Sequence, residues 1–451
     1  MSQRKLPPEW CNAKLGDIVP YGKTQKCVLS DVSDSTWVLE LEDVEKESSR
    51  VLARKTAAER PFKSTKNIFY KGNVLYGKLR PYLNKVVLAD EQGVCTTEII
   101  PLDAEPFVLN RYLFYWLKTH DFLSYVNEVS YGVNMPRLGT KDGISAPMVL
   151  APLAEQKIIA DKLDTLLAQV DNTKARLERI PVILKRFRQS VLASAVSGRL
   201  TEADQLDWAK VSIDDLVEVI NGKAFPSKEY QNNGVRLLRP GNLNVSGKVV
   251  WNEKNTTYIP RPWLKKRPEL LLKSGALLMN LTAQSLADEF LGRVCMFTEV
   301  DEPVLLNQRI CSFESRLEYD IRPYLFVLFR SPQFRTFVDI LDTGTLIKHM
   351  NVKSIKSFVL RLPPREEQTE IVRRVDQLFA YAARIEHQVN QSLVRVNNLA
   401  QSILAKAFRG ELTEQWRKDN PELISGKNSA EALLERIKAE RVTVKQTRGN
   451  V

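Results

Sequence analysis

Residues 152–202 read PLAEQKIIADKLDTLLAQVDNTKARLERIPVILKRFRQSVLASAVSGRLTE, and residues 364–414 read PREEQTEIVRRVDQLFAYAARIEHQVNQSLVRVNNLAQSILAKAFRGELTE. The two stretches align without a gap at a shift of 212 positions, and the match extends back to Tyr112 and Tyr324. Both contain a Glu-Gln pair near the start and Gly-x-Leu-Thr-Glu at the end. A match of this length and order indicates an internal duplication.

Each stretch carries apolar residues at alternating spacings of four and three, with Thr173 breaking the row in the first copy. This apolar seam consists of Ile159, Leu163, Leu166, Val170, Leu177 and Ile180 in the first copy, and of Ile371, Val375, Leu378, Ala382, Ile385 and Val389, continuing through Val396, Leu399 and Ile403, in the second. A mean period of 3.5 keeps one helix face toward a partner helix. The pattern therefore predicts two long helices that pack against each other. A core-facing helix of a globular domain remains the alternative.

The ends of both helices carry matching signals. The start, the first-turn carboxylate and the stop fall at Pro152, Glu155 and Gly198 in copy one, and at Pro364, Glu367 and Gly410 in copy two. Proline suits the first helical position, the helix dipole favours a carboxylate there, and glycine supplies a left-handed terminator. Pro181 predicts a kink in the first helix.

The beginnings of the copies match at a different shift, 198 positions, which places Trp10 on Trp208. Insertions therefore lie between these markers and the helices. The intervening segments alternate short β-branched and aromatic runs with turn residues, and helices are expected at 112–126 and 324–341. We predict an α+β fold with a pseudo-twofold internal repeat. Its expected parts are a domain at 1–150, a helix at 151–203, a second domain at 204–362, a second helix at 363–417 and a helical tail at 418–451.

Composition favours a cytoplasmic protein with an anionic partner. The 451 residues include 66 Lys+Arg against 54 Asp+Glu, a net charge of +12. The five cysteines have no paired spacing, which predicts reduced thiols. The sequence shows no apolar leader and no stretch of membrane-spanning length.

No catalytic or metal site is predicted. Residues 72–79 nearly spell a phosphate-binding loop, but Leu79 stands where the magnesium-binding Ser or Thr belongs, and Pro81 argues against a following helix. The sequence has no Asn/Asp-Pro-Pro-Tyr/Phe methyltransferase motif, and its three histidines have neither metal nor triad spacing. Taken together, these absences favour a binding protein.

The helix phrases PLAEQKIIADKLDTLLAQVD and EEQTEIVRRVDQLFAYA…SILAKAFRGELTEQWR closely resemble those of the specificity subunits of type I restriction-modification enzymes. GNVLYGKLRPYLNKV (72–86) and LLNQRICSF (305–313) also resemble phrases of this family, and NPELISGKNSAEALLERIKAERV (420–442) resembles the helical extension of some members. The order of parts, domain, helix, domain, helix, is similar as well.

The resemblance implies a DNA-binding protein without catalysis. Each domain would be a target-recognition domain that reads one half of an asymmetric, bipartite site in double-stranded DNA. The helices would form an antiparallel coiled coil that binds two modification subunits. Those subunits would bind S-adenosylmethionine and methylate adenine, and restriction subunits would use ATP and magnesium; this chain would bind no cofactor itself. Phage-encoded DNA-mimic inhibitors are a further expected partner.

Candidate DNA-binding residues are basic, amide and aromatic side chains in predicted loops, because Arg reads guanine and Asn or Gln reads adenine. They are Lys78, Arg80, Tyr82, Lys85, Asn134, Arg137 and Lys141 in the first domain, and Arg236, Arg239, Asn242, Gln284, Lys348, His349 and Lys353 in the second. Lys141 and Lys353 follow the matching Gly132 and Gly344, which predicts a shared phosphate contact. Solvated surface charge is the alternative for each residue.

Gln308-Arg309 follows an apolar run, so Arg309 is either a buried structural arginine or a DNA reader. Two other functions remain open for the whole chain. One is a self-contained DNA methyltransferase or endonuclease, which the missing motifs oppose. The other is a coiled-coil scaffold, which does not explain why the helices match better than the domains between them.

Overall fold

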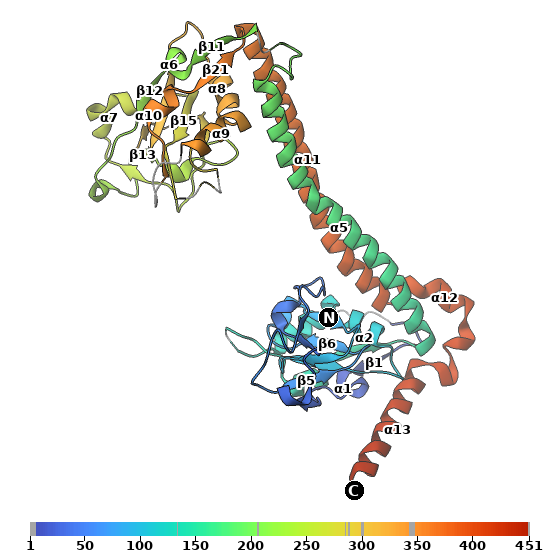
Figure 1. Ribbon diagram of the computed structural model, residues 1–451. Coiled ribbons are helices and arrows are strands. Elements are labelled where there is room, and N and C mark those ends of the chain that lie inside the picture. Colours follow the sequence, from blue (N-terminus) through green and yellow to red (C-terminus); the bar gives the residue numbers. More distant parts are fainter. Residues whose placement is uncertain are drawn as a thin grey trace. The chain divides into compact units, whose positions relative to one another are not determined.

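A computed structural model describes residues 6–132, 134–204, 207–284, 286, 289–298, 302–341 and 348–449 (Figure 1). The chain divides into two compact units. Unit 1 contains residues 1–178 and 391–451, and unit 2 contains residues 179–390. Among the described residues, every long helix is too polar to cross a lipid bilayer.

The first α+β domain, domain one, lies in unit 1 and is built on short strands. Five strands form a sheet in the order β2 (Lys26–Cys27), β5 (Lys66–Phe69), β8 (Gly93–Cys95), β3 (Trp37–Leu39) and β4 (Lys55–Thr56). A second sheet has the order β7 (Val86–Leu88), β6 (Val74–Gly77) and β9 (Ile99–Leu102), and β1 (Cys11–Lys14) pairs with β10 (Pro147–Leu150). Only β3 and β8 pair in parallel among these strands. Four helices complete the domain: α1 (Leu15–Ile18), α2 (Asn110–Trp116), α3 (His120–Val129) and α4 (Thr140–Ser145).

Unit 1 also contains helical segments from both long helices and from the C-terminal region. These are the first part of α5 (Leu153–Val196), the last part of α11 (Arg365–Phe408), α12 (Glu414–Asp419) and α13 (Ala430–Gly449). Apolar side chains of α5, α11 and α13 join the core of domain one. The ring of Phe408 lies 5.0 Å from that of Tyr112 and 5.2 Å from that of Trp116, and Leu433 of α13 is buried in the same core.

Domain two, in unit 2, is also a mixed α+β domain, but its described strands form different sheets. Its main sheet has the order β12 (Val217–Asn221), β19 (Ile310–Ser315), β15 (Ala276–Asn280) and β17 (Val294–Phe297). The smaller sheets are β14 (Tyr258–Ile259), β13 (Val235–Leu238) and β18 (Val304–Leu306), then β16 (Thr282–Ala283) with β20 (Lys348–His349), and β11 (Ala209–Ser212) with β21 (Val359–Leu362). The helices are α6 (Ile213–Leu216), α7 (Trp263–Lys266), α8 (Arg322–Phe329), α9 (Pro332–Ile340) and α10 (Val352–Lys356).

The duplicated elements of the two domains occupy equivalent places. The pair β1–β10 corresponds to β11–β21, and α2, α3 and α4 correspond to α8, α9 and α10. The helices expected at 112–126 and 324–341 are present, but each stretch contains two helices separated by a short break. The second of each pair starts at a hydroxyl cap: Thr119 accepts the Phe122 N–H and Ser331 accepts the Phe334 N–H.

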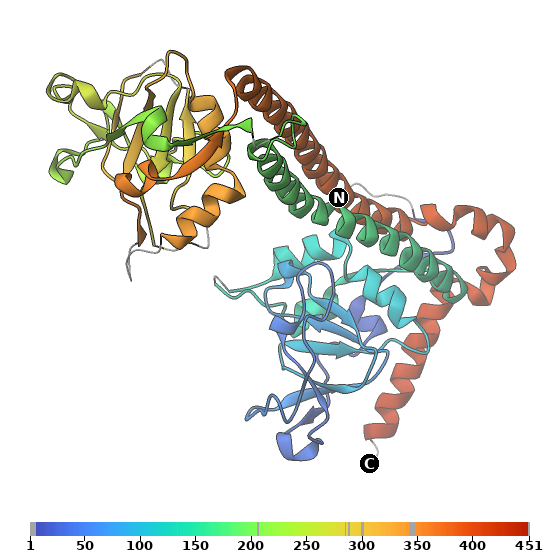
Figure 2. The same ribbon diagram turned by 45° about the horizontal axis from the view of Figure 1, so that its top comes forward.

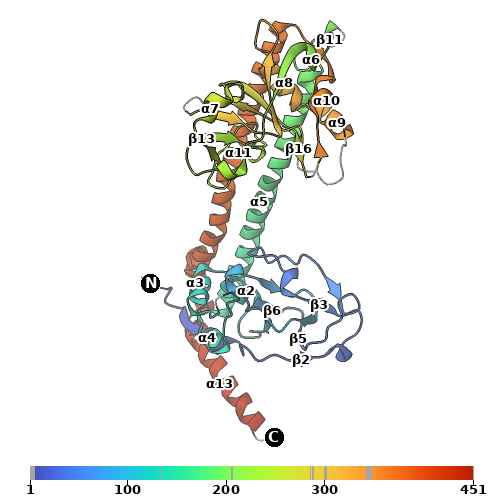
Figure 3. The same cartoon turned by 90° about the vertical axis from the view of Figure 1, so that its left-hand side faces the viewer.

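The long helices α5 and α11 lie side by side and run antiparallel (Figures 2 and 3). In unit 1 the start of α5, with Ile159 and Leu163, shares a core with the end of α11, with Ile403. In unit 2 the end of α5, with Val191, shares a core with the start of α11, with Ile371. This arrangement confirms the predicted antiparallel pair.

Most of the predicted seam faces inward. All twelve residues of the seam between Ile159 and Ile180 and between Ile371 and Val389 are buried or half-buried. Leu399 is a correction, since it is 48% exposed. There α11 packs against domain one as well as α5, so its buried face moves to Ile403, Leu404 and Ala407. Helix α5 continues through Pro181, and the predicted left-handed terminators Gly198 and Gly410 both have φ of +77°.

The segment that follows each long helix binds the start of the other helix. Glu155, at the start of α5, accepts hydrogen bonds from Trp10 Nε1 (2.7 Å), Thr413 Oγ1 (2.6 Å) and Arg417 Nη1 (2.6 Å). The equivalent Glu367, at the start of α11, accepts from the equivalent Thr201 Oγ1 (2.7 Å) and Trp208 Nε1 (3.0 Å). These two carboxylates fasten each domain to both long helices.

Candidate nucleic-acid interface

Two loops meet in domain one where sequence analysis placed most of its candidates. The turn after β6 lies beside residues 131–138. Leu138 N–H donates to the Lys78 carbonyl (3.0 Å), and Arg80 N–H donates to the Pro136 carbonyl (2.7 Å). Arg80 holds this turn in the left-handed region, at φ of +50°, and the short helix η3 (Pro81–Leu83) follows. Lys78 therefore follows a strand and precedes a turn, and no phosphate-binding loop is present there.

Domain two contains the same pair of loops. Met350 N–H donates to the Leu281 carbonyl (2.9 Å), as Leu138 does to Lys78 in domain one. Thr282 pairs with His349 in β16–β20, as Leu79 bridges to Arg137. Arg137 and His349 also match in the sequence repeat. We name these two features loop pairs. The loop pair of domain one is the turn at 78–83 with residues 131–138, and the loop pair of domain two is residues 281–284 with 348–350.

Several candidates of domain one are exposed on or near its loop pair. Arg80, Tyr82 and Asn134 are exposed, Lys78 is half-buried, and Lys141 is exposed on α4. Arg137 is half-buried, and its Nε lies 3.2 Å from a carboxylate oxygen of Glu98. The loop pair thus combines charge and amide groups with the exposed ring of Tyr82.

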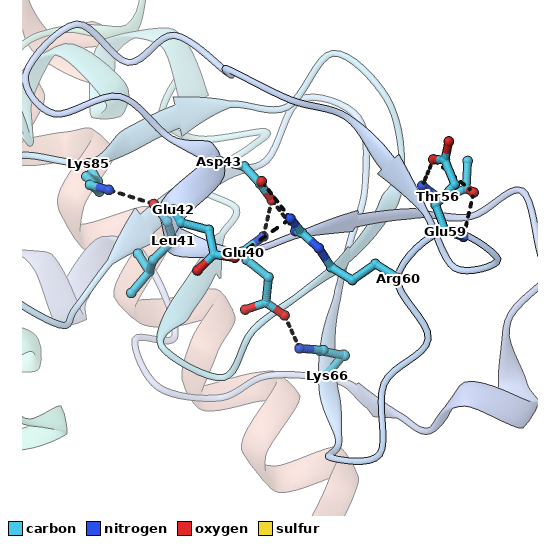
Figure 4. A network of polar contacts seen from close by, with 9 residues as sticks. All are labelled: Glu40, Leu41, Glu42, Asp43, Thr56, Glu59, Arg60, Lys66 and Lys85. Carbon is cyan, nitrogen blue, oxygen red and sulfur yellow. Dashed lines mark hydrogen bonds and ion pairs between the residues drawn. The ribbon is translucent and has the colours of Figure 1, made fainter. Parts of the chain in front are cut away.

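The side chain of Lys85, by contrast, makes a contact within domain one (Figure 4). Its Nζ donates to the Leu41 carbonyl (2.7 Å), and burial lowers its pKa. The neighbouring chain is held by buried ion pairs of Asp43 with Arg60 and of Lys66 with Glu40. Lys85 therefore supports the turn from inside the domain, and its contact with DNA stays a prediction.

In domain two, Gln284, His349 and Lys353 are exposed and Lys348 is half-buried. Lys348 and His349 form β20, and Gln284 follows β16 directly. Lys353 lies on α10, at the place that Lys141 occupies on α4. Gly344, the expected counterpart of Gly132, lies outside the described residues.

The remaining three candidates lie near β13. Arg236 is half-buried, its Nε lies 3.1 Å from a carboxylate oxygen of Glu302, and its guanidinium lies over the Trp251 ring. Arg239 is exposed. Asn242 is 1% exposed, and its Oδ1 accepts the Arg239 N–H (2.8 Å). Burial excludes Asn242 from DNA contact, so that assignment is corrected.

Sequence reasoning missed Tyr131, which is 61% exposed at the base of the domain-one loop. The backbone of Tyr131 exchanges two hydrogen bonds with Arg137, of 3.3 and 2.9 Å. The aromatic residue beside Gly132 was a usable signal, because glycine allows the tight turn that presents it; Gly132 has φ of +107°. Among the described residues, no cluster of three or more His, Cys, Asp or Glu side chains could hold a metal ion.

Comparison with known proteins gives one consistent result. The family model "Type I restriction modification DNA specificity domain" matches residues 7–182 and 205–395. The chain is 38% identical over 379 residues to the type I restriction enzyme EcoBI specificity subunit of Escherichia coli, covering 79% of this chain and 77% of that one. It is 43% identical over 351 residues to the EcoKI specificity subunit of Escherichia coli strain K12, covering 75% and 74%.

Solved structures are similar in fold. A chain from a study titled "Structural basis underlying complex assembly and conformational transition of the type I R-M system" has a TM-score of 0.73 at 19% identity, with 90% of this chain and 99% of that chain covered. The HsdS subunit from Thermoanaerobacter tengcongensis has a TM-score of 0.60 at 19% identity, with 91% and 99% covered.

Proposed function

The chain belongs to the family of type I restriction-modification DNA specificity subunits, and on that premise we propose that its two domains read the two halves of an asymmetric, bipartite site in double-stranded DNA. The observation that carries this proposal is that each domain has a loop pair at an equivalent place. Equivalent backbone hydrogen bonds hold both loop pairs, but the positions that Arg80 and Arg137 occupy in domain one are occupied by Ala283 and His349 in domain two. An identical frame with different side chains supports recognition of two different sequences.

We further propose that this chain has no catalytic activity. Two modification subunits would bind S-adenosylmethionine and methylate adenine in the site, and restriction subunits would use ATP and magnesium. Phage-encoded DNA-mimic inhibitors would compete for the same basic loops. The long helices offer exposed apolar side chains to subunit partners, among them Val182, Ile183 and Tyr381. A cytoplasmic location follows from this role.

The two alternative functions have less support. A coiled-coil scaffold leaves the duplicated loop pairs without a purpose. A self-contained methyltransferase is opposed by the missing Asn/Asp-Pro-Pro-Tyr/Phe motif, whose side chains would hold the adenine.

Adenine-methylation mapping tests the proposal. The chain and its modification subunit are expressed together, and each alone, in a host without adenine methylation. We expect one asymmetric, bipartite motif to be methylated only when both are present. Methylation by this chain alone would contradict the absence of catalysis, and a continuous or symmetric motif would contradict two different readers.

A further inference from the structure

Domain two has an open basic hollow of about 460 Å³ outside its loop pair. Three cationic side chains line it, those of Arg239, Lys254 and Arg309. The other lining residues are Tyr230, Pro240, Gly241, Asn255, Asn307 and Gln308. None of these nine residues is acidic, so the lining carries a formal charge of +3.

The wall that carries Arg239 is held in place by local hydrogen bonds. Asn242 Oδ1 fixes the Arg239 N–H, and Asn255 Nδ2 donates to the Gly241 carbonyl (3.2 Å). The Arg239 guanidinium lies 5.6 Å from the Tyr230 ring centroid, and its Nη1 donates to Thr257 Oγ1 (3.2 Å). Arg239 is therefore oriented before any ligand arrives.

Arg309 lines the same hollow. It is exposed, which removes the alternative of a buried structural arginine. Its backbone is left-handed, with φ of +72°, a conformation that costs free energy in any residue except glycine. The neighbouring Gln308 N–H is held by the Lys223 carbonyl (2.8 Å). Backbone strain at an exposed arginine that lines a hollow indicates a functional role for its position.

Arg309 also connects the hollow to the loop pair of domain two. Its carbonyl accepts the Leu281 N–H (2.8 Å), and the Leu281 carbonyl accepts the Met350 N–H. In domain one, the Glu98 carbonyl accepts the Lys78 N–H in the same way (2.9 Å). The two domains thus carry opposite charges at one equivalent place: Glu98 pairs with Arg137, whereas Arg309 adds a third cation to the hollow.

We propose that this hollow binds one backbone phosphate of DNA next to the half-site of domain two, with Arg239, Lys254 and Arg309 as its ligands. The inference rests on the proposed function, that domain two contacts DNA. Guanidinium groups bind phosphate oxygens through paired hydrogen bonds, and the lining offers no competing carboxylate. Domain one, with Glu98 at the equivalent place, makes no such contact there.

The test is the salt dependence of DNA binding. The full chain, assembled with modification subunits, is titrated onto a labelled duplex by fluorescence anisotropy at several salt concentrations. Arg239, Lys254 and Arg309 are changed together to Gln, and Lys210→Gln, an exposed lysine on β11, is the matched control. One lost phosphate contact lowers the slope of log Kd against log salt by about 0.9 and weakens binding roughly tenfold near 0.1 M salt. We expect this loss for specific and random duplexes alike, and no change for Lys210→Gln.

Three outcomes would overturn the inference. The triple variant could keep the wild-type slope, or its slope could fall by nearly three, which would mean three separate phosphates. Inorganic phosphate could raise the Tm of the wild type but not of the triple variant while duplex binding stays equal, which would assign the hollow to a free anion. If the wild-type assembly itself does not bind duplex DNA, the proposed function fails instead.

Discussion

Replacing Glu155 by Gln should destabilise unit 1 far more than the equivalent change, Glu367→Gln, destabilises unit 2. The Glu155 side chain is fully buried, and it is paired with Arg417, whose side chain is only 13% exposed. Removing one partner of such a pair leaves an uncompensated charge, which costs about 3–5 kcal/mol. Glu367 receives two neutral donors, Thr201 and Trp208, so its neutralisation should cost only about 1–2 kcal/mol.

Urea unfolding followed by hydrogen exchange of peptides from each unit measures both costs. The control is the double variant with Arg417→Met, which removes the stranded cation. We expect the pair Glu155 and Arg417 to show a coupling energy of about 2 kcal/mol or more. Equal losses for Glu155→Gln and Glu367→Gln, or additive effects in the double variant, would refute the reasoning.

Three further predictions concern single side chains. Burial lowers the pKa of Lys118 from 10.5 to about 8, so the unfolded chain binds more protons between about pH 8 and 10 and stability rises with pH there. At pH 7 this shift costs about 3 kcal/mol. Lys118→Met removes that cost together with the hydrogen bond to Ser49 Oγ, worth about 1 kcal/mol, so it should abolish the rise and stabilise unit 1 by roughly 2 kcal/mol at pH 7, as judged by urea midpoints at both ends of the window. Thr119→Ala and Ser331→Ala remove equivalent helix caps, so each should lower the unfolding free energy of its own unit by about 1 kcal/mol, and a change in the other unit would argue against the cap as cause. Arg309→Gly should relieve about 1–2 kcal/mol of left-handed strain, of which the greater freedom of glycine in the unfolded chain cancels about 0.5–1 kcal/mol, so Tm should rise slightly while DNA binding weakens. A variant that is neither more stable nor weaker in binding would contradict both the strain and the DNA contact.

The helical frame was predictable because its signals are local and repeated. A period of 3.5 residues over many turns, starts at proline and stops at glycine define long helices without knowledge of the rest of the chain. The exception, Leu399, has a physical cause. Where α11 packs against domain one and α5 together, the buried face is set by two neighbours, and the seam alone no longer predicts it.

The sheets were predictable only as a class. Strands of two to six residues leave short, ambiguous patterns, and the pairing of β3 with β8 joins residues more than fifty positions apart. Partners at that separation are selected by packing in the whole domain. The sequence therefore indicated a mixed α+β domain but not its strand order.

The residue types in the sequence predicted which loops carry candidate DNA-binding residues, but they did not predict the role of each side chain. Lys85 and Asn242 have the right chemistry for DNA, yet one supports a turn and the other is buried in one. The roles of Glu155 and Glu367 exceed the dipole interaction expected from their positions. The matching tryptophans at Trp10 and Trp208 were a signal for these two acceptors, because an indole N–H in a core needs a partner.

The central claim, that each domain reads one half of the DNA site, is tested most directly by exchange of domain one. Residues 11–150, from the start of β1 to the end of β10, are replaced by the corresponding segment of a relative with a different site, and adenine methylation is mapped with the modification subunit present. We predict that one half of the methylated motif changes to that of the donor while the other half stays the same. An active chimera that changes both halves, or neither, would contradict the claim.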